Sequence, residues 1–462
     1  MSDDADQRAG LLAPFRDPVI GRRLQLLTVA GLAIRWILMP IGISSDTLAV
    51  YWRAHLISSH GKLFEEYLVN LGSHVVHAMW LLVVQPFMGP ADEVWTHPWW
   101  WEADALVPSH MDAFLASDTA VRSIALLKVP YAVAELAAGL LLLGLVWHGA
   151  RRVGARADRA VAVWAFWMFS PAALYATYLF ARYEAFPVLA ILLALYLAER
   201  QRDWSAAVVL GVGVTLRTFP LLLIPVFALV LRRGLRRQTA WAAVAMVPYA
   251  LTVLFTRVFV GRAGELQNFS EYSFGDNFFV FAFRPPGDGP AILLLPTFLV
   301  ALGIYLLGRD HGWWGGTPID RSELWRWVAI ALLGVFLLSQ FSAHYLMWLT
   351  PAIGLVIGRR DRAGVGWLHL GQVAASFTAI FVLYGGAVFS GVLAGLGRQA
   401  MWSLPATAPF ADPVRTQLVG DLLWSVYVAA TLAIMVPLVL ETVRPRAVAV
   451  DASPPRRERQ DR

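Results

Sequence analysis

The sequence predicts an all-α protein with many membrane-spanning helices, on three observations. Apolar residues make up 58% of the 462 residues and charged residues only 15%, whereas a soluble domain has roughly 45–50% and about 25%. The apolar residues form runs of about 18–25, the length that a helix needs to cross ~30 Å of hydrocarbon. Arginines gather in alternate loops. A soluble enzyme and a disordered chain are therefore excluded, and the absence of cysteine excludes a disulfide framework, thiol catalysis and thiolate metal sites.

The apolar runs define one domain over 24–440, between two polar ends. Residues 1–23 contain four acids and do not resemble a secretory leader, and the run 24–43 is too long for one, so we expect an uncleaved first span. The tail 441–462 is expected to be cytoplasmic and disordered. Further spans are expected near 125–147, 161–178, 185–198, 239–259, 291–308, 327–341, 346–358, 364–390 and 416–440.

Residues 206–231 are expected to form a hairpin of two short helices, because arginines lie at both ends of this segment. The chain would turn at Arg217, since Pro220 follows and proline disfavours helix in the residue before it. Counting both short helices, the sequence predicts about twelve crossings.

The loop charges predict cytoplasmic termini in a plasma membrane. With this orientation, 26 of the 38 Lys and Arg residues lie on the cytoplasmic side, as the positive-inside rule requires. The pI near 9.7 therefore reflects topology, and no nucleic-acid partner is expected.

The loop 44–124 is much longer than most loops, which indicates a function on the outer face. Its apolar segment 71–88 is expected to form a helix flat at the interface. Tryptophans, whose rings favour headgroup depth, follow at Trp95, Trp99, Trp100 and Trp101.

Asp46 and the turn with Arg182 and Glu184 are candidate site residues on the outer face. Asp46 follows Ser44 and Ser45, so a helix N-cap with one of these serines and a general base are both open interpretations, and the two roles can hold together. Arg182 and Glu184 lie between two predicted spans, where a structural ion pair and a substrate site are equally good interpretations.

Arg217 is a stronger candidate, because a charge inside a bilayer usually faces a cavity, a partner or an anion. A guanidinium also matches phosphate with two parallel hydrogen bonds. His344 and Tyr345 lie in a polar outer turn and could donate to a phosphate or sugar.

His74 and His77 have a spacing that a metal could share, but two histidines do not make a site. The sequon at Asn268 and Ser270 is also weak evidence, because such sequons occur often by chance.

These motifs resemble the polyprenol-phosphate-sugar-dependent glycosyltransferases of the GT-C superfamily, most closely family 87 and the PIG-M-like mannosyltransferases. The resemblance covers most of residues 40–355 and lies in three stretches: Ser45-Asp46 through Tyr51 with Gly61 and Tyr67; Phe169-Ser170-Pro171, Glu184 to Pro187 and Gly211 to Pro220; and Ser342 to Leu346 with Pro351. Ser170 stands where the family has Asn, Arg182 and Glu184 where it has Gln and Asp, and Arg217 where it has Lys.

The resemblance implies a GT-C bundle whose first outer loop, with interfacial helices, covers a cavity. It implies inverting transfer of a sugar, expected to be mannose, from a polyprenyl-phosphate donor to a lipid-linked or glycan acceptor. Asp46 would be the catalytic base, and Arg217, His344 and Tyr345 would bind the donor phosphate. Arg182, Glu184 and Tyr51 are possible substrate contacts. A polyprenyl phosphate has no diphosphate to clamp, so no metal or other cofactor is expected.

Two other functions stay open from the sequence. A twelve-span secondary transporter or lipid flippase fits the span count and the buried arginine, but no repeat relates the two halves. A non-catalytic scaffold would fit a chain with a decayed site, but Asp46 is present.

Overall fold

The protein is described by a computed structural model over residues 10–63, 70–89, 95, 114–152, 157–260, 282–283, 292–313, 319–339, 341–360, 364–397 and 412–443. The tryptophans at 99–101, the sequon at 268–270 and the tail from residue 444 lie outside these described residues.

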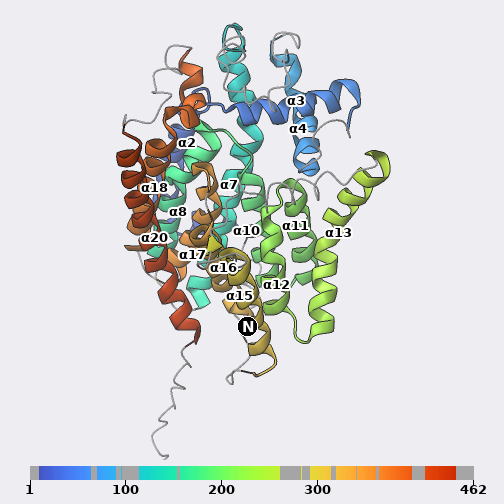
Figure 1. The fold of residues 1–462 in the computed structure, drawn as a ribbon, viewed down its shortest axis with the longest axis vertical. Coiled ribbons are helices and arrows are strands. Elements are labelled where there is room, and N and C mark those ends of the chain that lie inside the picture. Colours follow the sequence, from blue (N-terminus) through green and yellow to red (C-terminus); the bar gives the residue numbers. More distant parts are fainter. Residues whose placement is uncertain are drawn as a thin grey trace, which may run out of the picture.

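The described residues are almost entirely helical (Figure 1). One two-residue antiparallel pair joins β1 (Ala282–Phe283) to β2 (Ile292–Leu293). The α-helices are α2 (Gly21–Leu38), α3 (Ser45–His60), α4 (Leu71–Val84), α7 (Ala120–Arg152), α8 (Asp158–Met168), α9 (Pro171–Leu174), α10 (Ala185–Glu199), α11 (Asp203–Leu216), α12 (Ile224–Leu231), α13 (Leu235–Val260), α15 (Leu294–Asp310), α16 (Leu324–Leu338), α17 (Leu346–Arg360), α18 (Gly364–Tyr384) and α20 (Pro413–Val443). Shorter turns of helix are η1 (Ala13–Arg16), η2 (Gln85–Phe87), the π-helix η3 (Tyr175–Leu179), η4 (Phe219–Leu223), η5 (Arg321–Glu323), η6 (Ala343–Tyr345) and η7 (Gly386–Leu396).

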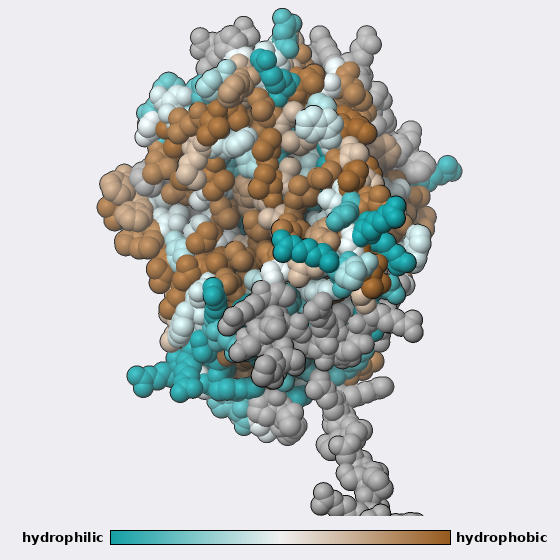
Figure 2. All heavy atoms as spheres, turned by 180° about the vertical axis from the view of Figure 1, so that it is seen from behind, coloured by the Kyte–Doolittle hydropathy of each residue, from teal (hydrophilic) through white to brown (hydrophobic). Residues whose placement is uncertain are grey.

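Several helices have the length and composition of membrane spans, which confirms the prediction of an all-α membrane protein. Among the described residues, five are long and apolar enough to cross: Ala120–Gly149, Asp158–Leu179, Leu235–Phe259, Gly364–Tyr384 and Pro413–Thr442. The count of twelve crossings stays a prediction, as does the orientation. Seen from behind, the middle of the molecule is covered largely by apolar side chains, and hydrophilic ones gather at its lower end (Figure 2).

The long helices form a bundle, and α3 lies across them near their upper ends (Figure 1). On one side α18 packs along α20, and in the middle α10 packs on α7 and α11. The chain reverses direction after α11, so that the end of α12 lies beside the start of α11. The Arg232 guanidinium is 3.1 Å from the Asp203 carboxylate there. The predicted hairpin of two short helices is therefore present, with Arg217 at its turn.

Helices α3 and α4 dock on α7 near a proline. Pro130 has no N–H, so the helix hydrogen bond to the Leu126 carbonyl is missing. The Trp80 indole of α4 donates to this carbonyl at 2.9 Å. One residue further on, the Tyr51 hydroxyl of α3 donates to the Leu127 carbonyl at 2.6 Å. Thus α3 and α4 are positioned by polar contacts with α7.

Two buried cations join α2 to the neighbouring spans. Arg35 forms a bidentate pair with Glu135 of α7, with its Nε and NH2 2.9 and 2.6 Å from the two carboxylate oxygens. The Lys128 ammonium donates to the carbonyls of Leu38, Gly42 and Tyr178, at 3.2, 2.8 and 2.7 Å. It therefore satisfies carbonyls at the end of α2 and in η3, where helical hydrogen bonding is incomplete.

Candidate active site

The turn between η3 and α10 is tied to the beginning of α3. The Ser44 N–H donates to the Phe180 carbonyl at 3.1 Å, and the Thr47 hydroxyl donates to the Ala181 carbonyl. Ala181 has φ of 61°, a left-handed conformation that costs free energy for a residue with a Cβ. A methyl group at Gly42 would lie 2.1 Å from the Leu179 carbonyl oxygen, so only glycine allows this close approach. As a result, residues 44–47 and 180–184 form one unit.

Asp46 is not the N-cap of α3. The Ser44 hydroxyl accepts from the Thr47 N–H and fills that role. The Asp46 side chain, 47% exposed, instead places its Oδ2 2.5 Å from the NH1 of Arg182. This contact gives the aspartate, which lies in the first turn of α3, a partner 136 residues further along the chain.

Arg182 lies among three polar groups. Besides Asp46, its NH1 is 3.3 Å from the Nε2 of His344, and its Nε is 3.6 Å from the Glu184 Oε1. Burial acts to lower the pKa of Arg182, but Asp46 together with Tyr345 and Tyr183 outweighs it, and the pKa is above its ordinary value. Arg182 is therefore positively charged whatever the pH of the medium.

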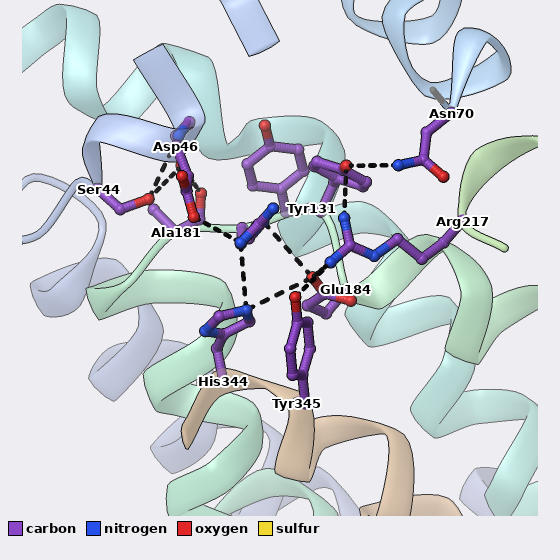
Figure 3. Close-up of polar contacts among 12 residues, drawn as sticks. Ser44, Asp46, Asn70, Tyr131, Ala181, Glu184, Arg217, His344 and Tyr345 are labelled. Atoms are coloured by element: carbon purple, nitrogen blue, oxygen red, sulfur yellow. Dashed lines mark hydrogen bonds and ion pairs between the residues drawn. The ribbon is translucent and has the colours of Figure 1, made fainter. Parts of the chain in front are cut away.

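Glu184 is a fully buried carboxylate between two guanidiniums. Its Oε1 lies 3.5 Å from the NH2 of Arg217 and 3.6 Å from the Nε of Arg182. Both carboxylate oxygens lack a hydrogen-bond partner within the described part of the chain. Glu184 hence balances the charge of the arginines without accepting a hydrogen bond from either of them (Figure 3).

Arg217 ends α11 with an extended backbone and reaches into the same cluster. Its NH1 donates to the Tyr183 hydroxyl at 2.8 Å, and its NH2 donates to the Tyr345 hydroxyl at 2.6 Å. Figure 3 shows Arg217 pointing toward Glu184 and Tyr345, with His344 beside them. The predicted phosphate-binding residues therefore meet in one place, although they come from different breaks between helices.

His344 is buried and stacks on the ring of Phe180, with ring centroids 4.4 Å apart. Burial, reinforced by the positive charges of Arg182 and Arg217, holds the pKa of His344 well below its ordinary value of 6.5. Since Arg182 can only donate, the Nε2 of neutral His344 accepts and the proton is on Nδ1. His344 in this state orients Arg182 and carries no charge for a phosphate.

Some predicted residues lie elsewhere, and one contact was missed. Tyr51 is fully buried, and its hydroxyl is used by α7, so the structure gives it a packing role and no open substrate contact. Tyr183, which sequence reasoning did not select, contacts Arg217 and also accepts from the Asn70 amide at 3.4 Å. No motif or spacing in the sequence identifies Tyr183 as a site residue, because only the fold brings it to Arg217.

His74 and His77 do not form a shared metal site. The His74 Nε2 is 3.1 Å from the Arg53 NH1, and the His77 Nε2 is 2.6 Å from the Tyr131 hydroxyl. Within the described ranges, no group of three or more His, Cys, Asp or Glu side chains comes close enough to hold an ion.

The cluster combines an accessible carboxylate with two arginines, which suits transfer of a group from a phosphate. Residues 119–339 match glycosyltransferase family 87. The resemblance seen in the motifs is confirmed at the level of this family, and the match supports a membrane glycosyltransferase over a transporter or a scaffold. A PIG-M-like specificity is not confirmed. No curated protein and no solved structure matches the chain.

The matched segment of family 87 contains Arg182, Glu184 and Arg217, and Asp46, His344 and Tyr345 lie outside it. The case for these last three residues therefore depends on their contacts with the matched part, above all the pair between Asp46 and Arg182.

Proposed function

We propose that the protein transfers a sugar, with mannose as the expected one, from a polyprenyl-phosphate donor to a lipid-linked or glycan acceptor at the outer face of the plasma membrane. The observation that carries the proposal is the meeting of Asp46, Arg182 and Arg217 in one buried cluster with an exposed edge. The family match supports the reaction class.

Asp46 is the proposed general base. Its carboxylate is 47% exposed, so an acceptor hydroxyl can approach it from outside the cluster. The acceptor oxygen attacks the anomeric carbon while the bond to the phosphate oxygen breaks, and the acceptor proton passes to Asp46. Attack opposite the leaving phosphate inverts the anomeric centre.

Arg217 is the proposed binding residue for the donor phosphate. Its side chain is 12% exposed, and its hydrogen bonds go to the neutral hydroxyls of Tyr183 and Tyr345, which a charged phosphate oxygen can replace. The phosphate becomes more negative as the sugar leaves, so a fixed positive charge stabilises the transition state more than the bound donor. The leaving group is a monophosphate, so the arginines can meet its charge and we propose that no metal is required.

An apolar groove of about 560 Å³ supports a lipid substrate. It runs between α2 and α7, and Tyr178 in its lining lies four residues before Arg182. A prenyl chain in this groove would begin close to the turn that carries the cluster. The other lining residues are Leu32, Ala33, Arg35, Trp36, Ile37, Met39, Ala132 and Leu136.

The test is sugar transfer by the Asp46→Asn variant, with a short synthetic prenyl-phosphate mannose as donor and a lipid extract as acceptor. General-base catalysis contributes roughly 10²–10⁴-fold, so we expect a loss of that size. Folding should change little, because Ser44 caps α3 and the amide oxygen of the substituted side chain can still accept a hydrogen bond from Arg182.

A matched control is Asp412→Asn, which removes the partner of Arg415 in an exposed pair at the start of α20. This variant should transfer sugar at the wild-type rate. Undiminished transfer by Asp46→Asn would remove Asp46 from the mechanism, and an equal loss of folded protein would show a structural role.

A further inference from the structure

The charges of the cluster cancel before any substrate arrives. Two guanidiniums, Arg182 and Arg217, face two carboxylates, Asp46 and Glu184. His344 adds no charge, because its low pKa keeps it neutral. A bound phosphodiester donor therefore brings one uncompensated negative charge into a poorly hydrated site, unless one of the arginines turns toward it.

Arg182 is the arginine that is able to change partner. Arg217 has fully buried Glu184 as its ionic partner, and water cannot replace it there, whereas the partner of Arg182, Asp46, is half exposed and can be hydrated. The Arg182 Nε is buried and has no hydrogen-bond partner in the described part of the chain. A phosphate beside Arg182 and Arg217 would satisfy this N–H.

Sugar transfer moves one negative charge from Asp46 to the phosphate. The carboxylate takes the acceptor proton and becomes neutral, and the electron pair of the broken carbon–oxygen bond stays on the phosphate. No charge is gained or lost by the site as a whole. A counterion placed between the two groups can then follow the charge.

We propose that Arg182 is this counterion: it pairs with Asp46 in the empty site and with the phosphate during and after transfer. The proposal rests on the proposed function and adds to it the order in which the two substrates bind. While Arg182 holds Asp46, the carboxylate is occupied; a bound donor draws Arg182 away and frees Asp46 for the acceptor. The donor therefore binds first, and Glu184 keeps Arg182 near both partners without a hydrogen bond that would hold it.

The test measures binding of farnesyl phosphate, a monoester with the charge of the leaving product, to purified full-length protein in detergent. The variants are Asp46→Asn, Arg182→Gln and the double variant. Asp46→Asn imitates the protonated base and releases Arg182, so farnesyl phosphate should bind about tenfold more tightly, or about 1.4 kcal/mol. In the Arg182→Gln background, the same substitution at Asp46 should give no more than about a twofold gain.

The monomethyl ester of farnesyl phosphate serves as the second probe, since it carries the single charge of the donor. Asp46→Asn should improve its affinity less than that of the monoester. Arg182→Lys keeps the positive charge, so adding Asp46→Asn to it should still give part of the tenfold gain in affinity. If both Arg182 variants lose the gain equally, a general loss of folding explains the result for Arg182→Gln. Asp412→Asn controls for the loss of one acid and should leave both affinities unchanged.

Three results of these binding measurements would contradict the proposed exchange. If the Asp46→Asn gain is equally large with and without Arg182, the two substitutions are additive, the effect is general electrostatics and the proposed exchange is wrong. If Asp46→Asn gives no gain, Arg182 is a fixed structural partner. If wild type does not bind farnesyl phosphate at all, the phosphate site itself is wrong, and the proposed function fails together with the exchange.

Discussion

Removing one partner of the buried pair between Arg35 and Glu135 is expected to destabilise the protein strongly. The Arg35 side chain is 3% exposed and that of Glu135 is fully buried. Glu135→Leu leaves the guanidinium with the carbonyls of Gly31, Trp167 and Met168 as acceptors, at 3.1, 3.5 and 2.8 Å, and without a counter-charge among the described residues. Breaking a buried pair by removing one partner costs about 3–5 kcal/mol. We expect the lower end, because an unfolded chain in a micelle also finds partners for a charge.

Two further variants separate the charge from the packing. In Arg35→Met with Glu135→Leu, both charges are gone and apolar side chains fill the space, so stability should return to within about 1–2 kcal/mol of wild type. Arg23→Met removes an exposed pair with Asp158, whose side chains are 64% and 67% exposed, and should cost less than about 1 kcal/mol.

The assay is unfolding in detergent micelles by a titration with denaturant, with the free energy of unfolding taken by linear extrapolation. A double-mutant cycle then gives the coupling between the two positions. The reasoning is refuted if Glu135→Leu alone is as stable as wild type, or if the double variant is as unstable as the worse single one.

Three other predictions concern the site and the topology. Arg217→Met should raise the donor KM and lower kcat, whereas Arg217→Lys should keep part of the activity; wild-type kinetics in Arg217→Met would make this arginine structural. Cysteines placed at Ser205 and Gly234 should both be labelled only from the cytoplasmic side, and labelling from opposite sides would contradict the hairpin in the membrane. The folded protein holds His344 neutral, so the unfolded state binds more protons below about pH 6.5 and the free energy of unfolding should fall as the pH falls, by at most about 1.4 kcal/mol per pH unit for this group. His344→Gln should flatten that slope in a thermal unfolding series, and an unchanged slope would show that His344 does not cause it.

The fold class could be predicted because membrane helices are specified locally. Length and apolarity decide a span, and proline and arginine mark where one must turn, as Arg217 and Pro220 do in the hairpin that Asp203 and Arg232 close. Asp46, Arg182, Glu184, Arg217, His344 and Tyr345 could be selected as candidates for a similar reason, since a charged or polar group at a helix break is costly unless something binds it.

The role of each candidate could not be read in the same way. The sequence left Asp46 as part of a cap, as a base, or as both, and the structure gives the N-cap role to Ser44. Tyr51 seemed available to a substrate, yet its hydroxyl docks on the Leu127 carbonyl, next to the Leu126 carbonyl that Pro130 leaves free for Trp80.

The sequence by itself determined an apolar, helical membrane protein with a segment that matches family 87 and a set of polar residues at helix ends. Only the tertiary structure decided that Asp46 faces Arg182, that Glu184 lies unbonded between two arginines and that Arg35 has Glu135 as its partner. Hydrophobic burial depends on the composition of a short segment, so it can be read along the chain. The pairing of charges depends on distances of a few ångströms between residues that can lie 100 or more positions apart, as Arg35 and Glu135 do, and helix packing sets those distances.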